Sequence, residues 1–297
     1  MKKICSMIVV AVNLILLSAC NDAAETKPAS APVEKIEKIK VPPLSVQLWS
    51  VKDAVKSDFE GTLKALANMG FQGVEFAGDY GNYSEDPKGL KAFLSSIGLK
   101  ASGAHIGVDQ LRGEKLDTTL SFLKDLGTDL VIIPYDSRAM STDGIVEFVA
   151  EVNALSQHLA KTGMTIGYHN HDQEFNDYKE STFWDYIAKN TPDDVLLQLD
   201  VGWVNFANKN PIDYVKRYQG RTLTTHYKIR THEGSAVSPI LGGDSFDWGA
   251  LIKANVEFGG TLWIVIEQEE CVKHGRNKEV ILGFFTIKKR VPLVAPF

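Results

Sequence analysis

Short apolar or β-branched runs alternate with amphipathic stretches along most of the chain, at intervals of roughly 25 to 35 residues. The runs predict eight strands: Ser45–Trp49, Gly73–Phe76, Lys100–His105, Leu130–Pro134, Thr165–His169, Leu196–Asp200, Thr222–Lys228 and Thr261–Glu267. Helical periodicity is clearest at Phe59–Met69, Leu90–Ile97, Leu116–Leu126 and Ile145–Lys161. Eight strand–helix repeats predict an α/β fold, a (β/α)8 TIM barrel.

Glycines and one polar pair support these element boundaries. A glycine follows each of four helical patterns and precedes a strand, as expected of helix ends: Gly70, Gly98, Gly127 and Gly163. Ser57 and Glu60 have capping-box spacing, which predicts a helix start at that point. A doubly wound sheet is the alternative architecture, but the residues after the first strand lack the glycine-rich phosphate loop that it would need.

The first nineteen residues have the pattern of a cleaved secretory signal. Lys2 and Lys3 precede an apolar run, Met7–Leu17, that is too short to span a bilayer. The run ends in Leu-Ser-Ala-Cys, which resembles the lipobox of bacterial lipoproteins and implies cleavage before Cys20 with lipid on its sulfur. An ordinary signal peptide, in which Cys20 has no role, is the alternative. The lipobox predicts a membrane-anchored protein of the cell envelope, on the periplasmic side of either membrane or at the outer surface.

Residues 20–43 are rich in Ala, Pro, Glu and Lys and present no apolar face, so we expect a flexible tether that starts at the lipidated Cys20. The barrel then occupies residues 44–297. The 297 residues are 44% hydrophobic and 23% charged, which suits one large core and disfavours disordered and multi-span membrane proteins.

The charge of the chain bears on its partners, and its cysteine content bears on disulfide bonds. The net charge is −5, and removal of residues 1–19 takes away two lysines and no acids, which makes it −7. An acidic chain without a dense basic run disfavours nucleic acid as a partner. Only Cys20 and Cys271 remain after cleavage, and lipidation of the first leaves no intramolecular disulfide.

Polar side chains recur where the predicted strands end, and in a TIM barrel these ends meet at one mouth. They are Gln47, Glu75, His105, His169, Asp200, His226 and Glu267. Each one alone has an ordinary explanation, such as a helix cap, an ion pair or a core histidine. Together they are costly to bury unless they pair or bind a cation. We therefore predict one divalent metal ion, whose mixed imidazole and carboxylate ligands do not select among Mn, Co, Zn, Fe and Mg.

Five segments resemble the sugar phosphate isomerase/epimerase family, whose fold is the xylose-isomerase-like TIM barrel. They are Val46–Val51, Met69–Gly78, Gly103–His105, Tyr168–Phe175 and Leu199–Trp203. The resemblance runs from about Leu44 to Glu270 and implies a small-molecule sugar substrate. The tail after Glu270 departs from the family's usual last helix, although residues 280–289 have a helical pattern.

The resemblance also implies which residues hold the metal. Family members use a carboxylate on strand five, Asp on strand six, His on strand seven and Glu on strand eight. Asp200, His226 and Glu267 match the last three. His169 stands at the strand-five position, so either His169 or the nearby Glu174 is the fourth ligand. We favour His169, because Glu174 lies five positions further on and beyond the strand.

These metal ligands imply proton abstraction beside a sugar carbonyl. That step produces an enediolate, whose negative charge a bound cation stabilises. We expect Glu267 to act as the base, Glu174 or His171 as its counterpart and Lys228 to polarise the carbonyl or a hydroxyl. The remaining residues expected to bind substrate are Gln47, Trp49, Glu75, His105 and Trp203.

The sequence thus predicts a metal-dependent isomerase or epimerase that acts on a keto sugar or related polyol. One alternative is a lyase or hydrolase that acts on 3-keto-glycosides through the same proton abstraction. Another is a sugar-binding lipoprotein without catalysis, since the strand-five carboxylate is altered. The identity of the sugar, the metal and the oligomeric state do not follow from the sequence.

Overall fold

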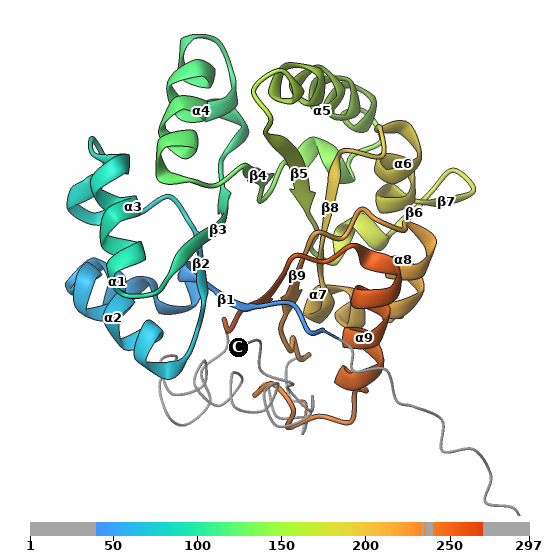
Figure 1. Cartoon of the computed structure of the whole chain (residues 1–297). Helices are drawn as coiled ribbons and strands as arrows, with labels where there is room; N and C mark the ends of the chain where they lie inside the picture. Colours follow the sequence, from blue (N-terminus) through green and yellow to red (C-terminus); the bar gives the residue numbers. More distant parts are fainter. Residues whose placement is uncertain (1–39, 233–234, 236–239, 270–297) are drawn as a thin grey trace, which may run out of the picture. The chain divides into compact units, whose positions relative to one another are not determined.

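Eight parallel strands close into a barrel, as the computed structural model in Figure 1 shows. The structure describes residues 40–232, 235 and 240–269. The predicted signal peptide, Cys20, residues 20–39 of the tether, Cys271 and the tail from residue 270 lie outside these described residues. The predictions made for them stay predictions.

The barrel strands follow the predicted runs closely. They are β1 (Leu44–Gln47), β2 (Gly73–Phe76), β3 (Lys100–His105), β4 (Leu130–Ile133), β5 (Thr165–His169), β8 (Leu196–Asp200), β9 (Thr224–Tyr227) and β10 (Trp263–Ile266). Neighbouring strands pair in the order β1-β10-β9-β8-β5-β4-β3-β2, and β1 pairs with β2 to close the ring. The TIM-barrel prediction is confirmed, and the doubly wound sheet is excluded.

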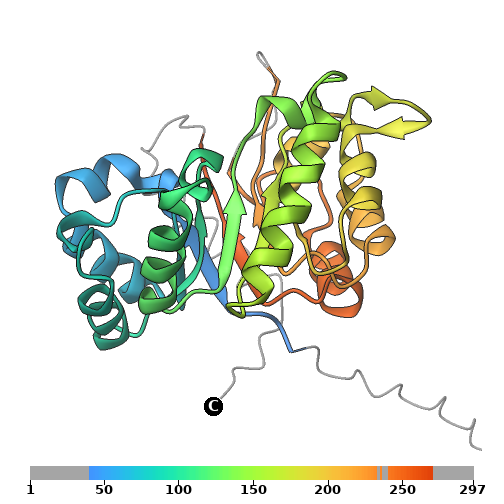
Figure 2. The same ribbon diagram turned by 90° about the horizontal axis from the view of Figure 1, so that it is seen from above.

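Helices surround the barrel, and a small hairpin of β6 (Asp177–Tyr178) and β7 (Ser181–Thr182) projects from its side (Figures 1 and 2). The helices are α1 (Lys52–Ser57), α2 (Phe59–Met69), α3 (Pro87–Ser96), α4 (Glu114–Leu126), α5 (Ile145–Ala160), α6 (Phe183–Asn190), α7 (Val201–Phe206), α8 (Pro211–Arg217) and α9 (Trp248–Ala254). Short 3-10 turns lie at Leu48–Val51, Gly81–Tyr83, Val108–Leu111, Ser137–Met140 and Gln173–Phe175, and a π-helical turn lies at Asn255–Gly259. None of the described helices has the length and apolar character that a membrane crossing requires.

The four glycines end their helices as expected, but one helix start was placed a residue too early. Gly70, Gly98, Gly127 and Gly163 all have positive φ, between 76° and 98°. Asp58, rather than Ser57, caps α2, because its carboxylate accepts a hydrogen bond from the backbone N–H of Gly61 at 2.9 Å. Ser57 is instead the last residue of the short helix α1, which the periodicity did not reveal.

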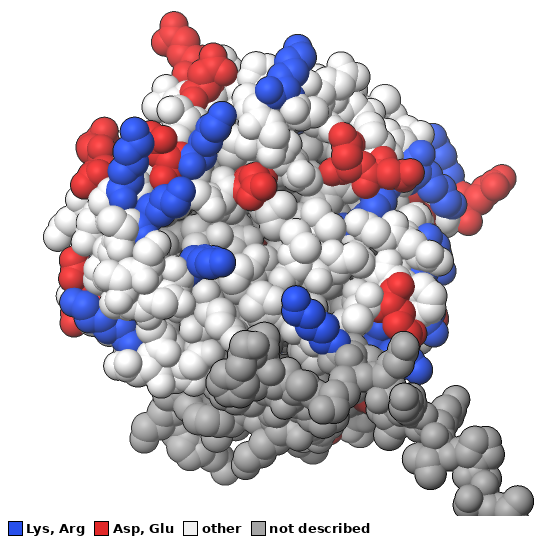
Figure 3. Space-filling model, viewed as in Figure 1, with Lys and Arg blue, Asp and Glu red and all other residues white. Residues whose placement is uncertain are grey.

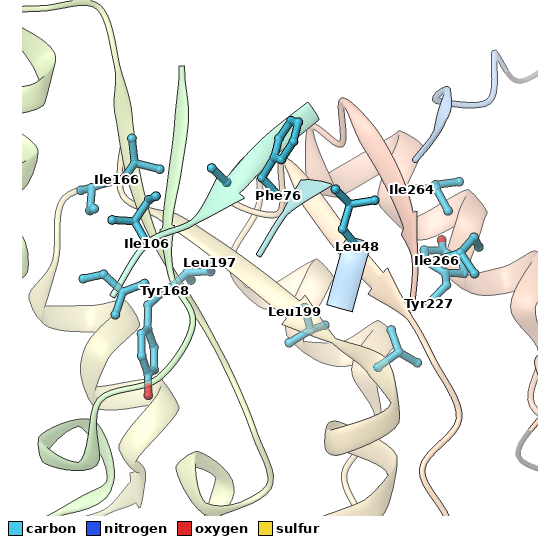
Figure 4. Packing of buried hydrophobic residues seen from close by; sticks show 14 of the residues in the cluster. Leu48, Phe76, Ile106, Ile166, Tyr168, Leu197, Leu199, Tyr227, Ile264 and Ile266 are labelled. Atoms are coloured by element: carbon cyan, nitrogen blue, oxygen red, sulfur yellow. The ribbon is translucent and has the colours of Figure 1, made fainter. Parts of the chain in front are cut away.

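Side chains along each strand point alternately out toward the helices and into the barrel, and the two sides are packed differently. Outward residues such as Ile166, Tyr168, Leu197 and Leu199 are buried in the hydrophobic layer around the barrel, which Figure 4 shows from close by. Inside the barrel a separate small cluster of Leu130, Ile132 and Leu196 forms an apolar layer. The strand residues that follow this layer toward the carboxyl ends are polar, so the barrel interior changes from apolar to ionisable along its axis.

The outer surface carries both signs of charge. Figure 3 shows lysine and arginine side chains interspersed with aspartate and glutamate over one face of the molecule. Such mixing suits a soluble surface, and the expectation that nucleic acid is not a partner stays a prediction.

Candidate active site

A cavity of about 460 Å³ opens at the carboxyl ends of the barrel strands. Its walls come from the ends of six strands and the residues that follow them: Trp49, Ala77, Gly78, His105, Gly107, Pro134, Tyr135, His169, His171, Glu267 and Glu269. Three larger hollows, of about 600, 560 and 520 Å³, lie elsewhere on the molecule and are lined mostly by polar residues. The cavity at the mouth adjoins His169 and Glu267, which belong to a cluster of buried ionisable side chains from several strand ends, so the site is built here.

Four predicted ligands meet beneath this cavity. One donor atom from each of His169, Asp200, His226 and Glu267 lies within 4.8 Å of the other three. The four residues come from the ends of β5, β8, β9 and β10, which are consecutive in the barrel. All four side chains are buried. The geometry therefore brings together Asp200, His226 and Glu267, which the family resemblance implied, and His169, the favoured fourth ligand.

His226 is held between two carboxylates. Its Nε2 lies 2.6 Å from Glu75 Oε2, and its Nδ1 lies 2.9 Å from Glu267 Oε2. Burial alone would lower the pKa of His226, but these two carboxylates raise it to about 10. Glu75 thus orients the ring from behind, an arrangement common around metal-bound histidines.

Gln198 decides which nitrogen of His169 carries the proton. Gln198 Nε2 donates to Glu75 Oε1 at 2.8 Å and to Thr224 Oγ1 at 2.7 Å, which fixes the amide orientation because an ionised carboxylate only accepts. Gln198 Oε1 must then accept from His169 Nδ1, 3.0 Å away. Burial, followed by the nearby His226, lowers the pKa of His169 and keeps the ring neutral. His169 Nε2 is left as a lone-pair donor, 3.8 Å from Asp200 Oδ2.

Lys228 supplies a buried cation beside the same carboxylates. Its Nζ lies 3.0 Å from Asp200 Oδ2, 3.2 Å from Glu267 Oε2 and 3.0 Å from Glu269 Oε2. Burial alone would lower the pKa of Lys228, but Asp200 and the two glutamates raise it, so the ammonium stays charged. Lys228 and His226 face four carboxylates in this cluster, so negative charge remains in excess if both are protonated.

These observations fit a divalent cation. Asp200 Oδ2 is buried and has no hydrogen-bond partner among the described residues, although it lies near Lys228. Burial raises the pKa of Asp200, and the nearby Lys228 offsets this effect only in part. Two imidazoles and two carboxylates form a donor set that suits Mn, Fe, Co or Zn. A metal ion bound by these four residues would offset the excess negative charge.

Glu174 does not join the cluster. It is fully buried, its Oε1 accepts from the Tyr168 hydroxyl at 2.6 Å, and its Oε2 accepts from the His171 backbone N–H at 2.9 Å. Tyr168 belongs to the outward layer of β5, so Glu174 lies outside the barrel wall. The structure therefore does not bring Glu174 to the cavity, where a residue that exchanges a proton with substrate would have to lie. His171, its alternative, does line the cavity.

Two residues expected to contact substrate lie below the cavity. Gln47 and Glu75 are both fully buried and absent from its walls, and Gln47 Nε2 donates to Glu75 Oε2 at 2.7 Å. Their polar atoms bond to each other inside the barrel, so the structure does not bring Gln47 and Glu75 to the cavity, where substrate binding was expected of them. In contrast, Trp49 and His105 do line the cavity.

Trp203 and Lys228 also stand back from the cavity. Neither lines its walls. The Trp203 ring lies 5.1 Å from Lys228 Nζ and 5.4 Å from the His171 ring. Trp203 therefore packs against these polar residues, and the structure does not place it in the cavity wall, where a sugar platform was expected.

Three residues of the site escaped the sequence reasoning. Gln198 looked like an interruption of an apolar strand, although its inward position follows from alternation with Leu197 and Leu199. Glu269 follows Glu267 by two positions, the spacing that places both on one face of an extended segment. Tyr135 follows a buried strand and Pro134, a signal no stronger than that of an ordinary loop residue.

Comparison with known proteins agrees with this architecture. Residues 63–280 match the family of xylose isomerase-like TIM barrels. An inosose dehydratase from Lacticaseibacillus casei is 23% identical over 250 residues, which cover 71% of this chain and 82% of that protein.

Solved structures share the fold. A sugar phosphate isomerase/epimerase from Parabacteroides distasonis superimposes with a TM-score of 0.69 at 22% identity, covering 89% of this chain and all of that one. An L-ribulose 3-epimerase superimposes with a TM-score of 0.64 at 15% identity, covering 84% of this chain and 94% of its own. At these identities the likeness concerns the fold.

Proposed function

Because the chain belongs to the family of xylose isomerase-like TIM barrels, we propose that it is a metal-dependent enzyme that removes a proton beside the carbonyl group of a keto sugar or related polyol. The observation that carries this proposal is the buried cluster of His169, Asp200, His226 and Glu267 at the barrel mouth. These four residues would hold the ion. When bound, a divalent cation supplies Lewis-acid stabilisation of the charge that develops on the carbonyl oxygen.

Glu267 is the proposed base. It is the one member of the cluster that is a carboxylate and also lines the cavity. Burial alone would raise the pKa of Glu267, but Lys228 and His226 hold it well below the usual range, so the carboxylate is ionised. Its contacts with these two residues use Oε2, and among the described residues no hydrogen bond reaches Oε1. Oε1 is therefore the oxygen that would take the proton.

We favour elimination as the outcome of this proton abstraction. Epimerisation needs a second group that returns the proton to carbon from the other face, and Glu174, one of the two residues expected to do so, does not line the cavity. Elimination needs no such group: the C–H electron pair forms a C=C bond, the β C–O bond breaks, and the departing oxygen takes a proton. The inosose dehydratases among the relatives, by their name, remove water.

Isomerisation or epimerisation is the second candidate. His171 lines the cavity, and its ring centroid lies 5.2 Å from that of His169. In this candidate mechanism His171 would return the proton to a substrate bound over the cluster. The L-ribulose 3-epimerase shows that the shared fold serves such an enzyme.

Deuterium exchange tests the proposal with Glu267→Gln. In D₂O, the wild-type protein should exchange the hydrogen beside the carbonyl of a panel of keto sugars, measured by NMR. Glu267→Gln should slow the exchange by roughly 10²- to 10⁴-fold, the usual contribution of a positioned base. Glu257→Gln, an exposed glutamate on the outside of the barrel, is the matched control. Full exchange by Glu267→Gln would overturn the assignment, and no exchange by the wild type would leave only sugar binding.

We also propose that the enzyme is anchored in the cell envelope through Cys20. The support is the lipobox-like Leu-Ser-Ala-Cys after an apolar run. Cys20→Ala should move the protein from the membrane fraction to the soluble fraction of the producing cells or to their medium. A protein that stays in the membrane fraction after this substitution would contradict the proposal.

A further inference from the structure

The cavity is divided into two halves of different chemistry. The proposed metal ligands come from β5, β8, β9 and β10, which are consecutive in the barrel ring. The opposite half follows β1, β2, β3 and β4, also consecutive. That half of the wall carries His105 at the end of β3 and six residues without a carboxylate or an imidazole: Trp49, Ala77, Gly78, Gly107, Pro134 and Tyr135. We call these six residues the apolar half.

Two exposed aromatic side chains stand in the apolar half. Four large hydrophobic residues are exposed in the described part of the chain, and the two aromatic ones, Trp49 at 45% and Tyr135 at 54%, both line this cavity. Scattered exposed hydrophobic residues are normal, but two aromatic rings at one cavity are a recognition feature. Their exposed rings can stack on a flat ligand group.

Each aromatic ring is supported by a neighbour. Lys52 Nζ lies 3.6 Å from the centre of the Trp49 ring and covers one of its faces. The Tyr135 ring meets the His171 ring edge-on, with centroids 5.7 Å apart. Tyr135 therefore adjoins the ionisable half, so a ligand group packed on it would lie next to the reacting ring.

The wall between the two aromatic residues is open. A Cβ atom placed on Gly107 would have no heavy atom within 4 Å, and the φ of Gly107 is −61°, which any residue adopts. Ala77 and Gly78 add only small side chains to the same wall. The space above these residues is thus unfilled by the described part of the chain, and a ligand group would fit there.

We infer that the apolar half is a subsite for the aglycone ring of a glycoside, and that the substrate is a keto-glycoside rather than a free sugar. This inference rests on the proposed function, since it places the reacting ring over the metal-ligand cluster. Proton abstraction beside the ketone, formation of the C=C bond and cleavage of the glycosidic C–O bond release the aglycone, whose oxygen takes up a proton. A free sugar would leave the apolar half empty.

Paired ligands test the subsite. Binding of methyl and phenyl 3-keto-glucoside is measured by calorimetry on the metal-loaded, full-length protein. The phenyl glycoside should bind the wild type about tenfold more tightly than the methyl glycoside. Trp49→Ala and Tyr135→Ala should each weaken phenyl binding by roughly three- to tenfold, as loss of one aromatic contact does, and leave methyl binding within about twofold.

Gly107→Leu gives a second test, because its side chain fills the subsite without disturbing existing packing. It should abolish the phenyl preference while methyl binding persists. Leu262→Ala, which truncates an exposed side chain at the other end of β10, is the control and should change neither affinity. Equal affinity of the wild type for both ligands, failure of either to bind, or equal losses of methyl and phenyl binding in the variants would overturn the inference.

Deuterium exchange on the methyl glycoside separates this result from the proposed function. Exchange without a phenyl preference refutes the subsite and leaves the function standing. A phenyl preference without exchange refutes the function and leaves a binding site for glycosides.

Discussion

Gln198 is the residue on which the geometry of the metal-ligand cluster most depends. Its amide spans the barrel from β8 to Glu75 on the opposite strand β2 and also reaches His105 and His169. A neutral amide is suited to this position because it donates to a carboxylate and accepts from imidazoles at once. Gln198 is thus a positioning residue that sets the tautomer of His169.

Replacing Gln198 should weaken metal binding. Gln198→Leu removes the acceptor for His169 Nδ1–H and leaves Glu75 without one of its donors. Loss of such an outer partner typically lowers metal affinity by about 10- to 100-fold. Titration of the metal-free protein with Zn²⁺ or Mn²⁺ measures the effect, with the exposed Gln110→Leu as the control. An unchanged affinity in Gln198→Leu would show that His169 needs no such partner.

Glu174 shows how a functional residue type can have a structural role. It lies fully buried, and burial raises the pKa of this carboxyl group. Hydrogen bonds from Tyr168 and from the backbone of His171 compensate for that burial. Glu174 therefore stabilises the turn that presents His171 to the cavity, instead of acting on a substrate itself.

At the scale of elements, an ion-pair network connects the loops that follow β3 and β4 to helix α5. Glu151 on α5 accepts from Arg112 Nε at 2.5 Å and Nη2 at 2.7 Å, and from Arg138 Nη2 at 2.5 Å. The same two loops carry Gly107 and Tyr135 of the apolar half. Bidentate arginine–carboxylate contacts in a network contribute more to folding stability than isolated surface ion pairs do.

This network predicts a pH-dependent stability. Hydrogen bonds from Arg112 and then Arg138 outweigh burial and lower the pKa of Glu151 to about 2 from an ordinary value of 4.5. A lowered carboxyl pKa contributes stability that is complete above the unfolded value and is lost as the pH falls toward the folded value. Glu151→Gln should therefore cost about 1 kcal/mol of unfolding free energy near pH 7.

Denaturant unfolding at several pH values measures this difference. The stability gap between the wild type and Glu151→Gln should narrow as the pH falls below about 4.5. The exposed Glu180→Gln in the β6–β7 turn is the control. A gap that stays constant from neutral to acidic pH would mean that the charge of Glu151 contributes nothing.

At the scale of the whole molecule, patterns among neighbouring residues in the sequence were enough to predict the barrel architecture. Strand runs such as Leu196–Asp200 and helix stops such as Gly70 depend on neighbours in the chain, and both were placed to the residue. Strand-end positions were also enough to collect Asp200, His226 and Glu267, because a barrel forces its strand ends together.

Depth and direction of side chains could not be predicted in the same way. Glu75 and His105 both end strands, yet only His105 reaches the cavity, since Glu75 is held by Gln47, Gln198 and His226 from other strands. These contacts join residues far apart in the chain. The anchor at Cys20 and the tail after residue 269 lie outside the described residues and stay predictions.

The metal content of the purified protein tests the central claim most directly, measured by mass spectrometry after incubation with Mn²⁺ or Zn²⁺ and removal of free ion. We expect one bound divalent ion per chain in the wild type and in Glu174→Gln. Asp200→Asn should bind almost none, although asparagine keeps the helix cap that Asp200 provides to Trp203 N–H. A wild-type protein that binds no ion, or a folded Asp200→Asn that binds as much as the wild type, would contradict the account.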